Sequence, residues 1–159
     1  MCRTNLIELL NWARDYHKTN KYPCDFLKRF AIGFYQIYQG IAWKDNDNRY
    51  ESFAAAGIHF LVCSEIVNLN LEQHKSLPVD LLELSQWSIS PVDLLFHLSR
   101  AQQMLIYLDN KTTTRKSRYN QKLLALDLSE SVKILFSAIP QNNRNLAIND
   151  AINIMTGIL

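Results

Sequence analysis

Apolar residues recur along the chain with the 3.6-residue period of an α-helix, and short polar segments separate the periodic stretches. Only four glycines and four prolines occur, so there are few turn signals of the kind that strands and hairpins need. The pattern predicts an all-α helical bundle of about six to seven helices. The expected elements are a helix over 5–19, one from Pro23 to about Trp43, one capped by Asn48, a short helix over 78–84, one from Pro91, one that ends before Pro140, and a last helix over 143–158.

Capping residues and side-chain size add detail to these helices. Asn5 and Glu8 have the spacing of a capping box, and the run from Ser90 to Asp93 places a cap, a proline and an acid in one first turn. The third helix is apolar on nearly all sides, so it should be the most buried one. Its small residues, 54–57, should let a neighbouring helix come close. In the last helix we expect inward-facing side chains at Ala147, Ala151, Ile154, Met155 and Ile158.

The chain contains a candidate internal repeat. Pro23-x-Asp25-x-Leu27 recurs as Pro91-x-Asp93-x-Leu95, and Arg49-Tyr50 recurs as Arg118-Tyr119 at nearly the same offset. Either two helical hairpins repeat one another, or they share start signals by chance, because proline and aspartate favour first turns. In both cases the sequence predicts two antiparallel hairpins flanked by further helices.

Composition indicates one folded domain over residues 1–159. Apolar residues make up 48% and charged residues 20%, and the net charge of +2 is too small to favour wrapping of nucleic acid. Cys2, Cys24 and Cys63 include no C-x-x-C pair, which is typical of reduced thiols in a cytoplasmic protein. The most apolar stretch, 53–67, is too short to span a membrane.

The order and spacing of the first three helices, from Leu6 to Leu69, resemble the MazG-like all-α NTP pyrophosphohydrolases. In that family the second helix bears E-x-x-E and the third E-x-x-D, and these carboxylates hold Mg²⁺ against the substrate phosphates. The corresponding positions here are Gly33, Gln36, Ala54 and Gly57, none of which is an acid. The resemblance therefore implies the family's helical arrangement without its metal ligands.

Other candidate chemistry is sparse. Asp127 and Glu130 place two carboxylates on consecutive helical turns and are weak metal-ligand candidates, the alternative being a solvated acidic face near Lys122 and Lys133. His59 and Cys63 have the spacing of two zinc ligands, but a core histidine beside a buried thiol is the favoured interpretation.

Two further features suggest binding. A basic loop over 111–118 could bind phosphates, although such loops are more often solvated turns; its cations are Lys111, Arg115, Lys116 and Arg118. An aromatic stripe could stack a base, but is more often core or subunit interface; it comprises Phe34, Tyr35, Tyr38 and Trp43.

The favoured hypothesis is a non-catalytic, MazG-like binding or assembly protein that forms a homo-oligomer, has no catalytic residue and needs no cofactor. A nucleotide or another protein is a further candidate partner. One alternative is a Mg²⁺-dependent nucleoside triphosphate pyrophosphohydrolase. A second is a nucleic-acid-associated protein that uses the basic loop.

Overall fold

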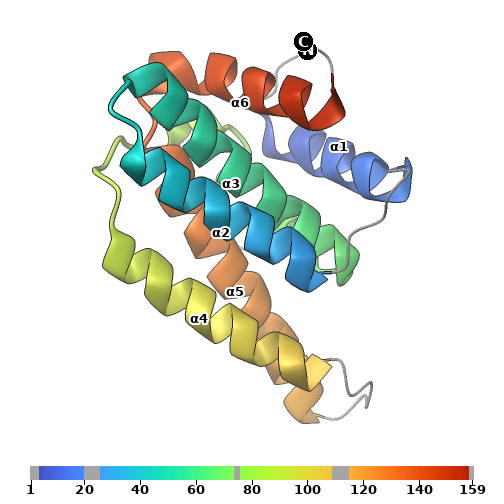
Figure 1. Cartoon of the computed structure of the whole chain (residues 1–159). Helices are drawn as coiled ribbons and strands as arrows, with labels where there is room; N and C mark the ends of the chain where they lie inside the picture. The colour runs from blue at the N-terminus through green and yellow to red at the C-terminus, as the bar shows by residue number, and fades with distance from the viewer. Residues whose placement is uncertain (1–3, 20–25, 74–75, 109–114, 158–159) are drawn as a thin grey trace.

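The computed structural model describes residues 4–19, 26–73, 76–108 and 115–157, with backbone only at 105–108 and 115–119. As predicted, the protein is all-α, and the described residues form six α-helices, two short 3-10 helices and no strand (Figure 1). The α-helices are α1 (Leu6–Thr19), α2 (Phe26–Ala42), α3 (Asn46–Ile66), α4 (Pro91–Leu108), α5 (Arg115–Ser137) and α6 (Gln141–Thr156); the 3-10 helices are η1 (Leu71–Gln73) and η2 (Leu81–Glu83).

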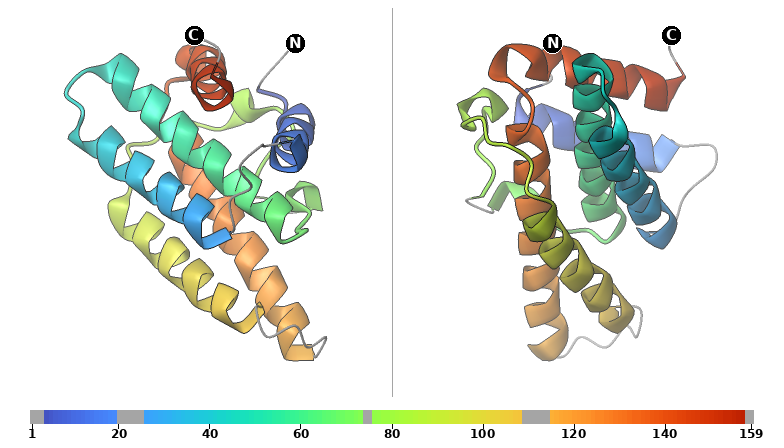
Figure 2. Two further views of the ribbon diagram at one scale, coloured as in Figure 1. Left: turned by 45° about the vertical axis from the view of Figure 1, so that its right-hand side comes forward. Right: turned by 60° about the vertical axis from the view of Figure 1, so that its left-hand side comes forward.

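Helix α3 forms the centre of the bundle. It packs against α1, α2, α5 and α6, whereas α4 packs mainly on α5. In all three views α6 lies at the top of the molecule with α1 beneath it, and the α4–α5 hairpin extends to the bottom (Figures 1 and 2). The two predicted hairpins are therefore present as α2–α3 and α4–α5, and they are joined through the contact of α3 with α5.

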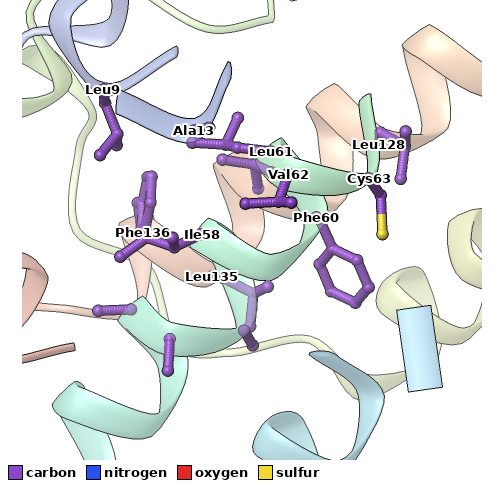
Figure 3. Close-up of a cluster of buried hydrophobic side chains, with 14 of the residues drawn as sticks. Leu9, Ala13, Ile58, Phe60, Leu61, Val62, Cys63, Leu128, Leu135 and Phe136 are labelled. Carbon is purple, nitrogen blue, oxygen red and sulfur yellow. The ribbon is translucent and has the colours of Figure 1, made fainter. Parts of the chain in front are cut away.

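The hydrophobic core surrounds α3. Figure 3 shows side chains from α1, α3 and α5 meeting there, among them Ala13, Leu61 and Phe136. Every residue of α3 from Ser52 to Ser64 is buried, which confirms the prediction that this helix is the most enclosed. Such all-round burial explains why the helix has apolar residues on every side.

Close approach at glycines holds the helices together. A Cβ atom built on Gly57 would lie 2.7 Å from Cε1 of Phe136, and one built on Gly40 would lie 2.5 Å from Cε1 of Phe53. Both distances are too short for a real Cβ contact. At Gly57 the absence of a side chain thus admits an aromatic ring from α5.

Local signals predicted most helix ends. The Asn5 side chain accepts a hydrogen bond from the Glu8 amide at 3.1 Å, and Ser90 Oγ accepts one from the Asp93 amide at 3.4 Å. The predicted cap of α3 was wrong: Asp45, not Asn48, caps the helix, and it accepts bonds from both the Asp47 amide and the Asn48 side chain. Asp45 competes better because an ionised carboxylate is a stronger acceptor than an amide oxygen.

Three other expectations need correction. The segment expected as a short helix over 78–84 contains only the 3-10 helix η2, and α6 starts at Gln141 rather than Asn143. The predicted loop over 111–118 is also too long, because α5 begins at Arg115. On α6, Ile154 is exposed, whereas Ile148 and Ile152 face the core beside Ala147 and Ala151.

Candidate functional site

The first buried polar pair joins the two helices of the α2–α3 hairpin. Arg29 Nη1 lies 3.2 Å from Nδ1 of His59, and both residues are buried. Because a guanidinium can only donate, Nδ1 of His59 accepts and its proton resides on Nε2. Burial, and secondly the charge of Arg29, lowers the pKa of His59 to about 3. His59 is therefore a neutral core histidine beside the buried Cys63, as the sequence favoured.

A second polar cluster joins the two helices of the α4–α5 hairpin. Asp127 is 0% exposed and receives two hydrogen bonds from Arg100: Nε to Oδ2 at 2.8 Å and Nη2 to Oδ1 at 2.8 Å. His97 Nδ1 lies 2.9 Å from Oδ1 of the same carboxylate. This bidentate geometry is the strong form of an arginine–carboxylate pair. The cluster thus neutralises the charge of Asp127 within the protein.

The weak metal-ligand candidates, Asp127 and Glu130, are hydrogen-bonded to other side chains. Both oxygens of Asp127 already accept hydrogen bonds, and Glu130 Oε1 accepts one from Ser76 Oγ at 2.6 Å. Among the described residues, no group of three or more His, Cys, Asp or Glu side chains could hold a metal ion. The alternative of a solvated acidic face is wrong for Asp127, because that side chain is fully buried.

The two polar pairs occupy equivalent positions in the two hairpins. The shift along the chain that places Pro23 on Pro91 also places Arg29 on His97 and His59 on Asp127. In each pair the partners are 30 residues apart. The candidate repeat thus extends to a polar contact across each hairpin. Sequence analysis missed these contacts, although the repeated spacing itself was the signal that could have found them.

Next to the second cluster is a polar pocket of about 310 Å³. His97, Glu130 and Lys133 line it from α4 and α5, and Trp87 and Ser88 line it from the preceding segment. Since Nδ1 of His97 is engaged by Asp127, Nε2 is the ring nitrogen that is left to contact a ligand. The pocket therefore offers acidic, basic and hydroxyl groups together, and no single charge dominates it.

A second concave feature is apolar and lies between α2 and α4. This α2–α4 groove has a volume of about 140 Å³ and is lined by Phe34, Ile37, Tyr38, Ile41, Pro91, Leu94, Leu95 and Leu98. Tyr38 is 70% exposed and Leu95 is 51% exposed. Both helices face the viewer in Figure 1.

The aromatic stripe predicted on α2 is consequently not core. Its members are all exposed, namely Phe34, Tyr35, Tyr38 and Trp43. The apolar residues of α2 are buried only in part. Phe30 and Ile37 are enclosed, whereas Leu27, Phe34 and Ile41 remain accessible. Of the interpretations offered for the stripe, burial in the core of this chain is wrong.

The structure leaves the predicted phosphate-binding cations untested. Lys111 lies outside the described residues. The other three, Arg115, Lys116 and Arg118, belong to the first turns of α5, where only the backbone is described. Cations at a helix N-terminus face the positive end of the helix dipole, which is the less favourable end for them.

Two of the four positions that the MazG-like resemblance assigns to metal ligands, Gly33 and Gly57, lie against packed aromatic rings. Gly33 faces the ring of Phe60, with 2.9 Å between a built Cβ and Cε1, and Gly57 faces Phe136. Ala54 is fully buried. A carboxylate at Gly33 or Gly57 would therefore collide with the core unless a ring moved.

Comparison with family models, with curated proteins and with solved structures finds no match to this chain. The resemblance thus remains a hypothesis about descent. Among the described residues, no helix combines the length and the apolar character that a membrane span requires.

Proposed function

We propose that this chain is a non-catalytic helical binding and assembly protein that associates with a second copy of itself through the α2–α4 groove. The observation that carries the proposal is the groove itself. It is lined by apolar residues and bordered by accessible aromatic and aliphatic side chains. Exposed apolar surface of this kind, when it is contiguous, marks interaction sites in soluble folds.

The composition of the groove is that of an interface centre. The segment from Phe30 to Trp43 contains no charged residue and no histidine, although several of its large side chains are exposed. Interface centres are depleted of charge and enriched in aromatic residues, and tyrosine is a frequent energetic hot spot. Burying Tyr38 and Leu95 against a partner would remove apolar area from water, and neither side chain brings a charged group that would have to lose its hydration.

A second copy is the partner that this surface suits, because the two groove-lining helices also carry further exposed apolar side chains. Tyr35 on α2 and Val92 on α4, each next in sequence to a residue that lines the groove or begins its helix, are 57% and 76% exposed. A two-fold interface requires self-complementarity, in which the same patch of each copy contacts the other. The low net charge of +2 adds little repulsion between copies.

Light scattering coupled to size-exclusion chromatography tests the proposal. We expect twice the chain mass for the wild type, and a monomer for Tyr38→Glu and for Leu95→Glu, because each change places a charge in the groove. Leu146→Glu is the matched control, since Leu146 is 60% exposed on α6, away from the groove. A wild type that stays monomeric at all concentrations would contradict the proposal.

The non-catalytic part of the proposal rests on the placement of the acids and glycines in the described part of the chain. Gly33 and Gly57 are covered by aromatic rings, and Asp127 is engaged by Arg100. We therefore expect no pyrophosphate release when the pure protein is incubated with NTPs or dNTPs and Mg²⁺. Release that disappears in Glu130→Ala would instead favour the pyrophosphohydrolase alternative.

A further inference from the structure

A third concave feature lies at the start of α3, on a part of the molecule that the assembly proposal does not use. This pocket has a volume of about 240 Å³. Asn46, Arg49 and Tyr50 line it from the first turns of α3, and Gln86 and Trp87 line it from the segment that leads to α4. The sequence singled out Arg49-Tyr50 only as part of a repeat, so no role has yet been assigned to this pair.

Arg49 gives the pocket its charge. Among the described residues that line it, Arg49 alone carries a formal charge. Its Nε atom is shielded from solvent and has no hydrogen-bond partner among the described residues. An unpartnered buried donor is unfavourable for the fold, and the residue to which it belongs lines the pocket.

The N-terminus of α3 adds little positive charge to the pocket, because two acids of the same turn offset the partial positive charge of its amide groups. The two acids of this turn, Asp45 and Asp47, do not line the pocket. Asp45 is instead engaged as the cap, where it accepts from the Asp47 amide and from the Asn48 side chain.

The walls of the pocket are flat and aromatic. Tyr50 and Phe53 contribute from α3, and Trp87 contributes from the opposite segment. Trp87 is 71% exposed, which is unusual for so large an apolar side chain. Its backbone is nevertheless fixed, because its amide donates to the carbonyl of Ser137 at 2.9 Å. An exposed indole carried by an anchored backbone provides a stacking surface for a planar ring.

We infer that this pocket binds a small planar ligand that carries an oxyanion, either a phosphate or a carboxylate. The guanidinium of Arg49 receives the oxyanion, for which its planar fork is suited. The ring of the ligand stacks on Trp87. Phosphate and carboxylate share this chemistry, and the probes below distinguish them.

Isothermal titration of the full chain with phenyl phosphate, benzoate and inorganic phosphate tests the inference. We expect saturable binding of at least one of the two ring probes, and weaker binding of inorganic phosphate, which cannot stack. The relative affinity of phenyl phosphate and benzoate identifies the preferred oxyanion. Arg49→Gln should weaken binding of the ring probes about tenfold or more, which corresponds to the loss of about one charge-assisted hydrogen bond.

Three variants separate specific recognition from general effects. Arg14→Gln removes an exposed arginine that pairs with Glu65 outside the pocket, and it should bind the probes like the wild type. Trp87→Ala should weaken the ring probes and leave inorganic phosphate unchanged. Arg49→Lys keeps the charge but loses the fork and should bind less tightly than the wild type. Absence of saturable binding by every probe, or equal affinities in Arg49→Gln and the wild type, would overturn the inference.

Discussion

His59 couples the stability of the protein to pH. Its imidazole is enclosed between α2 and α3 and accepts a hydrogen bond from Arg29. Burial and the neighbouring cation lower its pKa to about 3, so the folded protein keeps the ring neutral at pH values where an unfolded chain protonates it. This residue therefore binds its proton preferentially in the unfolded state.

The consequence is a loss of stability in acid. Between pH 6.5 and about 3, the unfolded chain binds a proton at His59 that the folded chain does not, so the free energy of unfolding should fall as pH falls through this window. One such group contributes at most about 1.4 kcal/mol per pH unit. In His59→Gln, denaturant unfolding measured from pH 7 to pH 4 should show a shallower slope than in the wild type.

His17, a half-buried residue near the end of α1, lies outside the Arg29–His59 contact and provides a comparison for this measurement. His17→Gln leaves that contact intact and should keep the pH slope of the wild type. If the slopes of His59→Gln and the wild type coincide, the ring is not held neutral in the folded protein.

Arg144 has a structural role that its charge does not suggest. It is fully buried, and it donates to four backbone carbonyls, those of Phe136, Ile139, Leu81 and Leu84, at 2.6–2.9 Å. These carbonyls belong to the end of α5 and to the η2 segment, so one side chain satisfies acceptors from both. The guanidinium serves as a connector between two elements that are distant in sequence.

Removing this connector should destabilise the fold. Arg144→Met keeps much of the volume but leaves buried carbonyls with fewer partners, and we expect a loss of about 2–4 kcal/mol in the free energy of unfolding. Urea denaturation followed by circular dichroism measures it. Arg14→Met, at an exposed ion pair, is the matched control and should leave the midpoint nearly unchanged.

At the scale of helices, the packing of α3 against α5 requires a residue without a side chain at position 57. Gly57 lies where the ring of Phe136 enters, and a Cβ there would be 2.7 Å from the ring. Glycine is a poor helix former, so its presence in the middle of α3 is unfavourable for the isolated helix. Packing against Phe136 accounts for its place in this helix.

Gly57→Ala should therefore destabilise the protein, despite the gain of about 1 kcal/mol in helix propensity. Overpacking of this kind costs about 1–3 kcal/mol. In combination with Phe136→Leu, which removes the colliding ring atoms, the cost of the alanine should shrink or vanish. A double-mutant cycle by chemical denaturation measures this coupling, and strict additivity would show that the two residues do not constrain one another.

The starts of helices were predicted correctly where a nearby side chain accepts a hydrogen bond from an amide of the first turn. The Asn5 and Ser90 caps were predicted because a cap bonds to an amide only a few residues away. Asn48 was mistaken for the cap of α3 because three polar residues precede it, and the sequence does not show which of them starts the helix. In the structure the helix begins at Asn46, and the Asp45 side chain caps it.

At the scale of the whole molecule, the arrangement of the two hairpins creates the proposed interface. Each of α2 and α4 packs one face on its hairpin partner, and their remaining apolar residues border a common groove. Tyr38 and Leu95 come from different hairpins. The groove consequently exists only when both hairpins are folded and docked.

Self-association through this groove should make thermal stability depend on protein concentration. Binding of a second copy to the folded state alone raises the apparent melting temperature by mass action. We expect the Tm of the wild type to rise as protein concentration increases, and that of Tyr38→Glu to stay constant. Differential scanning calorimetry over a wide concentration range measures both. A constant Tm in the wild type would contradict association at these concentrations.

The order of the helices, the central place of α3 and the presence of two hairpins were determined by the sequence itself. They depend on the period of apolar residues and on caps, which act between residues close together in the chain. Tertiary structure alone decided that Arg100 and His97 bind Asp127, that aromatic rings cover Gly33 and Gly57, and that Phe34 and Tyr38 stay exposed. Such contacts join residues on different helices, and periodicity says which face of a helix is apolar but not which neighbour, if any, will cover it.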